Sequence, residues 1–148
     1  MEIRPATTDD IPAMHRIRLA VRENVLTDPS RIQPADYAAL LRGPGRGFVA
    51  LVDGRVVGFG IANAASRNLW ALFVDPAFEG RGIGRRLHDE LLDWLFGLGS
   101  APAWLTTEPG SRAERFYRVA GWQDAGRDAG KDPGGDLRLE FHPFDDEA

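Results

Sequence analysis

Closely spaced glycines and arginines at residues 72–87, LFVDPAFEGRGIGRRL, carry the strongest chemical signal in the sequence. An apolar run ends before Asp75, three glycines follow at alternate positions, and an amphipathic helical pattern begins at once. Such glycines let backbone N–H groups converge on an anion, and the helix dipole adds roughly half a positive charge there. The segment therefore predicts a pyrophosphate-binding turn made of Gly80, Arg81, Gly82, Ile83, Gly84, Arg85 and Arg86.

The glycine spacing disfavours two common phosphate ligands. A dinucleotide fingerprint, G-x-G-x-x-G, would need glycine at position 85 or 87, and these positions hold arginine and leucine. A Walker A loop, with G-K-S/T after four spacers, does not occur in the sequence. NAD and ATP are therefore disfavoured, and the non-functional interpretation is a glycine-rich connection with solvated arginines.

A second informative stretch is GSRAERFYRVAGW at residues 110–122, which predicts a helix that ends before Gly121. Adjacent side chains on a helix are offset by about 100°. We therefore expect Phe116 to face the core and Tyr117 to point into a cleft. Taken alone, a tyrosine in this setting is usually a core or rim residue.

Together, the two stretches resemble the GNAT superfamily of acetyl-CoA-dependent N-acyltransferases. The first family signature, Q/R-x-x-G-x-G/A, corresponds to residues 79–84. Gly82 and Gly84 match it, whereas Glu79 replaces the usual Gln or Arg and places an acid beside the phosphate site. The second signature matches at Ala113, Tyr117 and Gly121, with Trp122 as the aromatic and Gly110 where many members have Asn.

The resemblance implies an α/β fold with a seven-stranded mixed sheet, splayed between its fourth and fifth strands and flanked by about four helices. The pantetheine arm of acetyl-CoA would enter this splay and pair with the backbone of Leu72, Phe73 and Val74. The pyrophosphate would bind the amides at residues 80–85. The implied reaction transfers acetyl from acetyl-CoA to a primary amine of a small molecule or peptide, by direct attack in a ternary complex.

Catalysis of this reaction needs proton transfers. An unperturbed tyrosine has a pKa of about 10 and a thiol about 8.5, so Tyr117 can hold a proton at neutral pH and deliver it to the leaving thiolate. The backbone N–H of Val74 or a neighbour is the family-style oxyanion donor. The base is open between Glu108, which can equally be a solvent-exposed residue before a helix, and a chain of water molecules.

The acceptor site would be walled by the first two predicted helices and their connection. Arg18 and Arg22 share a helical face beside the apolar stripe, which suits a substrate with a carboxylate. Glu23 and Asp28 would suit a second amine, and Tyr37 lies on the same wall. An ordinary solvated helix face is an equal alternative for these residues.

Two other functional classes stay open from the sequence. One is a GNAT-like module that holds acyl-CoA without turnover. Glu79 leaves this class open, and so does the fourth predicted strand, NLWALFV, which lacks the carboxylate that many family members use there. The other is an α/β domain for a nucleotide or sugar phosphate.

The elements that must position these residues follow from hydrophobic periodicity and turn residues. Thr8 is the predicted cap of the first helix, and Asp53-Gly54 fits a type I′ hairpin turn. The predicted helices are residues 9–25, Pro34–Leu41, Arg81–Phe96 and Ser111–Ala120. The predicted strands are Met1–Thr7, Gly47–Val52, Arg55–Ala62, Asn68–Val74, Ala103–Thr107, Trp122–Ala125 and Leu137–His142.

Composition sets the remaining expectations. The 148 residues suit one domain, expected over residues 1–142 with an acidic tail at 143–148. A net charge of −4 argues against nucleic-acid binding, and no apolar run could span a membrane, so a cytoplasmic protein is expected. A homodimer is expected mainly because the resemblance implies it. The aromatic residues Trp94, Phe96 and Trp104 could contribute to an interface, and all three could equally be core residues of one subunit. No metal is expected, because the chain has no cysteine and its three histidines lack the spacing of metal ligands. These histidines, His15, His88 and His142, are expected at the surface.

Overall fold

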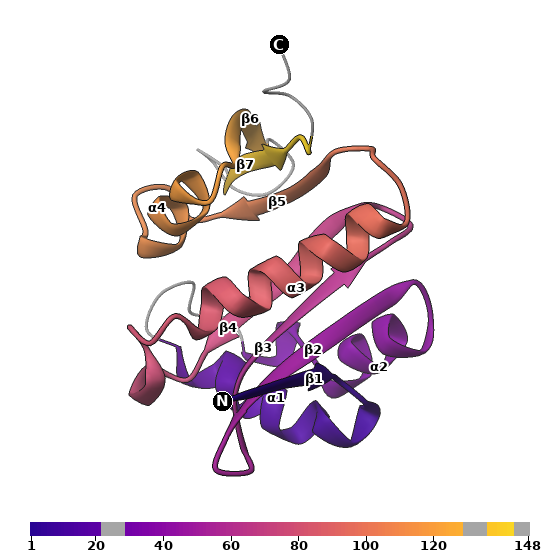
Figure 1. The fold of residues 1–148 in the computed structure, drawn as a ribbon, viewed down its shortest axis with the longest axis vertical. Coiled ribbons are helices and arrows are strands. Elements are labelled where there is room, and N and C mark those ends of the chain that lie inside the picture. The colour runs from indigo at the N-terminus through magenta and orange to yellow at the C-terminus, as the bar shows by residue number, and fades with distance from the viewer. Residues whose placement is uncertain (22–28, 129–135, 144–148) are drawn as a thin grey trace.

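The computed structural model describes residues 1–21, 29–128 and 136–143, which form one sheet flanked by helices (Figure 1). The strands are β1 Glu2–Pro5, β2 Gly45–Val52, β3 Arg55–Asn63, β4 Asn68–Val74, β5 Ala103–Thr107, β6 Gln123–Asp128 and β7 Asp136–Phe141. The helices are α1 Ile11–Ala20, α2 Pro34–Arg42, α3 Ile83–Gly97 and α4 Arg112–Val119.

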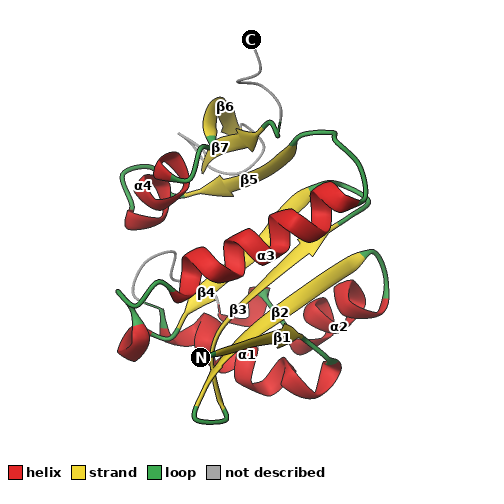
Figure 2. Cartoon of the chain, in the orientation of Figure 1, coloured by secondary structure: helices red, strands yellow, loops and turns green. Residues whose placement is uncertain are grey.

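The sheet has the strand order β1-β2-β3-β4-β5-β7-β6, and its neighbouring strands are antiparallel except for β4 and β5. Those two strands run parallel and pair at one position, Asn68 with Trp104. Beyond that pair they diverge, so the sheet opens into a V between them (Figure 2). The predicted seven-stranded, mixed and splayed sheet is confirmed.

A bulge in β4 explains why the two strands part. Ala71 pairs with Ile61 of β3, and Leu69 pairs with the next residue, Ala62, so Trp70 is an extra residue in the ladder. A bulge bends its strand and increases the local twist. Because Trp70 follows closely on the Asn68 pair, the bend turns the rest of β4 away from β5.

Arg67 holds the closed end of the V, with its backbone in the left-handed region (φ 65°). Its guanidinium donates to the carbonyls of Leu95 (3.0 Å), Gly99 (2.8 Å) and Ala101 (2.7 Å). Its own carbonyl accepts from the N–H of Trp104 (3.0 Å). Arg67 therefore links the end of α3, the connection to β5 and the start of both parting strands.

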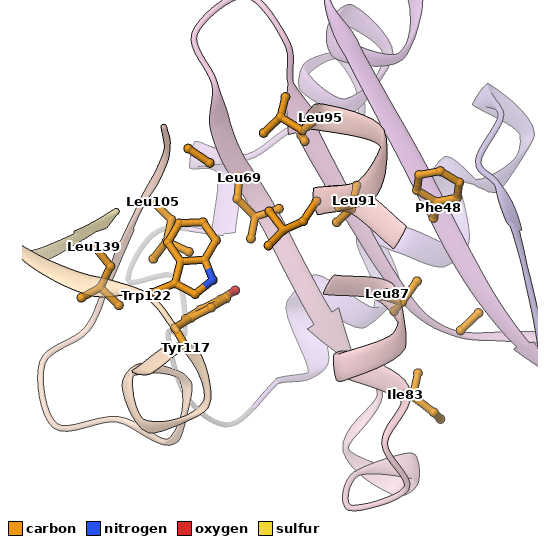
Figure 3. Close-up of a cluster of buried hydrophobic side chains, with 14 of the residues drawn as sticks. Phe48, Leu69, Ile83, Leu87, Leu91, Leu95, Leu105, Tyr117, Trp122 and Leu139 are labelled. Atoms are coloured by element: carbon orange, nitrogen blue, oxygen red, sulfur yellow. The ribbon is translucent and has the colours of Figure 1, made fainter. Parts of the chain in front are cut away.

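Helices cover both faces of the first part of the sheet: α3 lies on one face of β2–β4, and α1 and α2 lie on the other. On β2, Phe48 and Ala50 face α3 whereas Val49 faces α1 and α2, as the two-residue period of a strand requires. A side chain at Gly60 of β3 would collide with Leu91, so this glycine allows α3 to approach closely. The helix spine in Figure 3 consists of Ile83, Leu87, Leu91 and Leu95.

The local predictions have mixed outcomes. Strands Asn68–Val74 and Ala103–Thr107 are confirmed to the residue, and the Asp53-Gly54 turn has positive φ at both positions (51° and 76°). The first helix is wrong at both ends. Thr7, and not Thr8, caps its opening turn, and α1 ends at Ala20 because Val21 is extended (φ −67°, ψ 152°). The rest of its predicted length, residues 22–25, and the tail at 144–148 lie outside the described residues.

The aromatic side chains behind the expected homodimer have contacts within the chain. Arg46 stacks over Trp94 (5.6 Å), and Phe96 packs on Phe141 (5.7 Å). The indole N–H of Trp104 donates to a backbone carbonyl (2.9 Å). These contacts leave the homodimer as a prediction without structural support from these residues. Across the described ranges, no helix combines the length and the apolar character needed to cross a membrane.

We predict that Arg67→Asn destabilises the fold. Asparagine tolerates the left-handed backbone, so this change removes the guanidinium hydrogen bonds with little added backbone strain. The free energy of unfolding in urea should fall by about 1–3 kcal/mol, the usual cost of losing hydrogen bonds from a charged donor. An unfolding free energy equal to that of the unmodified chain would show that Arg67 does not hold the closed end.

Candidate active site

The backbone of β4 offers hydrogen-bond groups to the open V. The Asp75 N–H donates to the Val57 carbonyl of β3 (2.8 Å), and the Phe73 carbonyl lies against Gly58 of β3. Because backbone groups point alternately to the two sides of a strand, those of Leu72 and Val74 point away from β3. Their N–H and C=O groups therefore face the V, whereas the backbone of Phe73 is used by β3.

The larger of two adjoining cavities, about 490 Å³, lies between the end of β4, the start of α3 and α4. Its walls include most of the residues predicted to hold acetyl-CoA. Those residues are Leu72, Phe73, Val74, Gly80, Gly82, Ile83, Gly84 and Arg85. Arg81 and Arg86 are not among its lining residues, and Arg81 stacks over Phe78 (4.9 Å).

Free backbone donors line the α3 end of the larger cavity. Gly80 and Gly82 both have a φ of 79°, and nothing lies within 4 Å of where a Cβ would stand. The Arg86 N–H donates to the Gly82 carbonyl (3.2 Å). The N–H groups of the preceding residues, Ile83, Gly84 and Arg85, have no partner inside the helix. The helix dipole is also positive at this end. This end of the larger cavity suits an anion.

Glu79, the departure from the family signature, is paired. Its carboxylate lies 3.3 Å from the guanidinium of Arg112 at the start of α4. Both side chains line the larger cavity and both remain partly solvated, so the pair is a weak one. The pair nevertheless offsets the negative charge that Glu79 places beside the glycine turn.

The smaller cavity, about 340 Å³, lies on the other side of β4 and is lined from α1, α2, β4, β5 and α4. It shares wall residues with the larger cavity, so the two spaces adjoin where β4 parts from β5. The shared residues are Leu72, Phe73, Ala113 and Tyr117. Two molecules, one from each side, could therefore meet at Tyr117.

Tyr117 is buried, with 8% of its surface exposed, and it packs on Trp122 (5.6 Å). Phe116 is the more exposed neighbour and lines the larger cavity, so the expectation that Phe116 takes the core position is wrong. The Tyr117 hydroxyl is directed from α4 towards β4 (Figure 3). Burial raises the pKa of Tyr117 above its ordinary value, so the hydroxyl keeps its proton at neutral pH.

Among the residues expected at the acceptor site, Arg18 and Tyr37 line the smaller cavity. The Tyr37 hydroxyl lies 3.0 Å from Nδ1 of His15, and burial raises the pKa of Tyr37 to about 12. Burial lowers the pKa of Arg18, whose guanidinium lies over the ring of Phe73 (4.5 Å). Arg22 and Glu23 lie outside the described residues.

Glu108, the candidate base, is exposed at the end of β5 and lines the smaller cavity. The sequence interpretation missed its neighbour. Thr107 pairs with Leu137 in the antiparallel β5–β7 ladder, which places Asp136 opposite Glu108, and Asp136 lines the same cavity. The register between β5 and β7 brings Asp136 to this place, and no motif in the sequence indicates that register.

His88 is buried at 1% exposure in α3, so its expected surface position is wrong. The indole N–H of Trp122 donates to its Nε2 (2.9 Å), which makes that nitrogen an acceptor and the ring neutral. Its Nδ1 then donates to Asp89 (2.8 Å). The bond between Trp122 and His88 ties α3 to the chain that follows α4. No group of His, Cys, Asp and Glu in the described residues could hold a metal ion.

Comparison with known proteins identifies the family. The sequence profile described as the acetyltransferase (GNAT) family matches residues 11–122, which is most of the chain. The chain belongs to the GNAT family. This match covers the glycine turn, Tyr117 and both cavities' shared walls, and it confirms the predicted resemblance.

Individual GNAT proteins resemble the chain in sequence or in fold. An N-alpha-acetyltransferase RimI of Mycobacterium tuberculosis is 34% identical over 100 residues, 63% of this chain and 62% of that protein's length. Two solved structures share the fold. The ribosomal-protein-S18-alanine N-acetyltransferase of Escherichia coli has a TM-score of 0.76 and 21% identity over 95% of this chain and 92% of its own. A phosphinothricin acetyltransferase of Sinorhizobium meliloti in complex with acetyl-CoA has a TM-score of 0.73 and 19% identity. The match covers 95% of this chain and 87% of that protein's chain.

We predict that His88 makes the stability of the fold depend on pH. Burial lowers the pKa of His88 below its unfolded value of about 6.5. As the pH falls below about 7, the unfolded chain takes up a proton that the folded chain does not, so stability is lost. The free energy of unfolding should decline from pH 7 towards pH 5.5, and this slope should be smaller in His88→Gln. His142→Gln, directly after the end of β7 and partly exposed, is the matched control and should keep the slope. Equal slopes in all three proteins would contradict the assignment.

Proposed function

We propose that the chain is an acetyl-CoA-dependent N-acetyltransferase that acetylates a primary amine of a small molecule or peptide. The observation that carries the proposal is the junction of the two cavities at the parted strands, with Tyr117 and Leu72 in both linings. A donor in the larger cavity and an acceptor in the smaller one would place the reacting atoms at this junction. Transfer then needs no covalent enzyme intermediate.

The larger cavity fits acetyl-CoA. The free N–H groups at the start of α3 would bind the pyrophosphate, and the open positions at Gly80 and Gly82 leave room for it. The backbone of Leu72 and Val74 would pair with the amides of the pantetheine arm, in the manner of an added strand. The thioester would then reach the junction beside Tyr117.

The reaction follows from the groups at the junction. The neutral amine nitrogen attacks the acetyl carbon, the N–C bond forms and the C–S bond breaks. The Val74 N–H would stabilise the oxyanion that develops on the acetyl oxygen. The nitrogen gives up one proton to Glu108 or to water, and Tyr117 supplies one proton to the sulfur. Protons are conserved, because the proton lost by the amine passes through solvent and reprotonates Tyr117.

Gly82→Asp is expected to weaken acetyl-CoA binding at least about tenfold, because it places a negative charge beside the pyrophosphate site. Gly54→Asp is the matched control. Gly54 has a similar φ (76° against 79°) and equally open surroundings, but it lies in the β2–β3 turn. Both variants should lose similar stability, so calorimetric titration with acetyl-CoA isolates the effect of position. Equal affinities in both variants would reject the glycine turn as the pyrophosphate site.

Tyr117→Phe is expected to lower kcat by about 10²–10⁴-fold, the usual contribution of a general acid, while acetyl-CoA affinity stays nearly unchanged. The change removes one oxygen and leaves the packing on Trp122 in place. The measurement is kcat beside the acetyl-CoA dissociation constant, with an amine that the enzyme accepts. A kcat within about threefold of the unmodified enzyme, with chemistry rate-limiting, would reject Tyr117 as the acid. Acetyl-CoA binding without turnover of any amine would support the non-catalytic acyl-CoA-binding module instead.

A further inference from the structure

Resting on the proposed function, we infer that the acceptor is a small zwitterion of the amino-acid class, with its carboxylate bound by Arg18. The inference concerns the smaller cavity and names the chemistry that its walls select. Two observations carry it: one guanidinium nitrogen of Arg18 lacks a hydrogen-bond partner among the described residues, and basic and acidic residues line the cavity from different elements.

Arg18 offers a hydrogen-bond donor that lacks a partner. Its Nη1 is buried and has no hydrogen-bond partner in the part of the chain that the structure describes. Leaving a buried charged donor unpaired is costly, so such a group in a cavity wall points to a ligand that completes it. The guanidinium stacks over Phe73, which occupies a face of its plane. The N–H groups lie in the plane of the guanidinium, so its edge remains suited to a carboxylate.

The charged residues of the smaller cavity divide by sign between two walls. Arg18 comes from α1 and Arg31 from the turn before α2, whereas Glu108 and Asp136 come from the facing ends of β5 and β7. Aromatic residues also line the cavity, and among them Trp70 packs on Tyr37 of α2 (5.5 Å). A ligand with a carboxylate at one end and an amine at the other complements this arrangement. The amine of this ligand would lie on the side of Glu108, near the junction of the two cavities at Tyr117.

The same arrangement disfavours the N-terminus of a polypeptide. In a peptide, the carboxyl group nearest the amine is an amide, which leaves the charge of Arg18 without a counterion. Sites built to bind a polar group reject analogues that lack it, because the buried partner is left unpaired. A volume of about 340 Å³ also lies at the small end for ligand cavities, which suits a compact molecule.

The test compares amines that differ in the carboxylate alone. Each common amino acid that has a primary amine and no thiol, which excludes proline and cysteine, is assayed against its α-carboxamide and against a hexapeptide with the same first residue. Release of coenzyme A is followed with a thiol reagent, which reads no protein thiol because the chain has no cysteine. The variants are Arg18→Gln, Arg18→Lys and the matched control Arg16→Gln. Arg16 lies on the same helix, is exposed and donates to the Val56 carbonyl (3.1 Å), outside the smaller cavity.

We expect at least one amino acid to exceed its amide and its hexapeptide about tenfold or more in kcat/KM, the size of a lost charged hydrogen bond. Arg18→Gln should bring the ratio of the amino acid's kcat/KM to that of its amide close to one. Arg18→Lys should restore part of the preference, and Arg16→Gln should keep it. Loss of stability alone would lower all acceptors together, so the ratio reports on recognition.

Two results would overturn the inference in different ways. Turnover of amides or peptides equal to that of amino acids, or a preference that survives in Arg18→Gln, would reject carboxylate recognition and leave the proposed acetyltransferase standing. Binding of acetyl-CoA with no turnover of any acceptor would reject the proposed function, and this inference with it.

Discussion

The site depends on one constraint: β4 and β5 are held together at a single pair and kept apart beyond it. The Asn68–Trp104 pair and the Arg67 hydrogen bonds fix the closed end, and the bulge at Trp70 turns β4 away. A central strand normally uses its backbone groups on both sides. Here one side of β4 is left open within the fold, so Leu72 and Val74 can serve a ligand without any change in the sheet.

The opening also fixes the place of the proposed reaction. Both cavities adjoin at the V, and α4 brings Tyr117 to their common wall. For the two cavities to adjoin at Tyr117, strands β5, β7 and β6 must be held at a fixed distance from strands β1–β4. The buried bond between Trp122 and His88 supplies such a link, because it joins α3 on the first part of the sheet to the chain after α4. The geometry of the proposed site and the stability of the fold therefore share the same contacts.

Patterns local in the chain were predictable. The β4 and β5 strands were found to the residue because apolar runs end at strong turn residues, Asp75-Pro76 in the first case. The glycine turn was singled out by the spacing of its glycines before a helix, whereas Tyr117 was singled out only through the resemblance to the family. The bulge at Trp70, the burial of His88 and the place of Asp136 opposite Glu108 depend on strand register and packing between distant segments. No short pattern encodes these contacts, and the end of α1 at Ala20 likewise breaks a helical periodicity that continues in the sequence.

The most direct test of the open strand is amide hydrogen exchange, followed residue by residue with NMR before and after acetyl-CoA is added. We predict that the Leu72 and Val74 amides exchange fast in the free protein and become protected when acetyl-CoA binds. The Phe73 amide, already facing β3, should be protected in both states. Protection of Leu72 and Val74 in the free protein, or exchange that acetyl-CoA leaves unchanged, would contradict the claim that β4 presents its backbone to the donor.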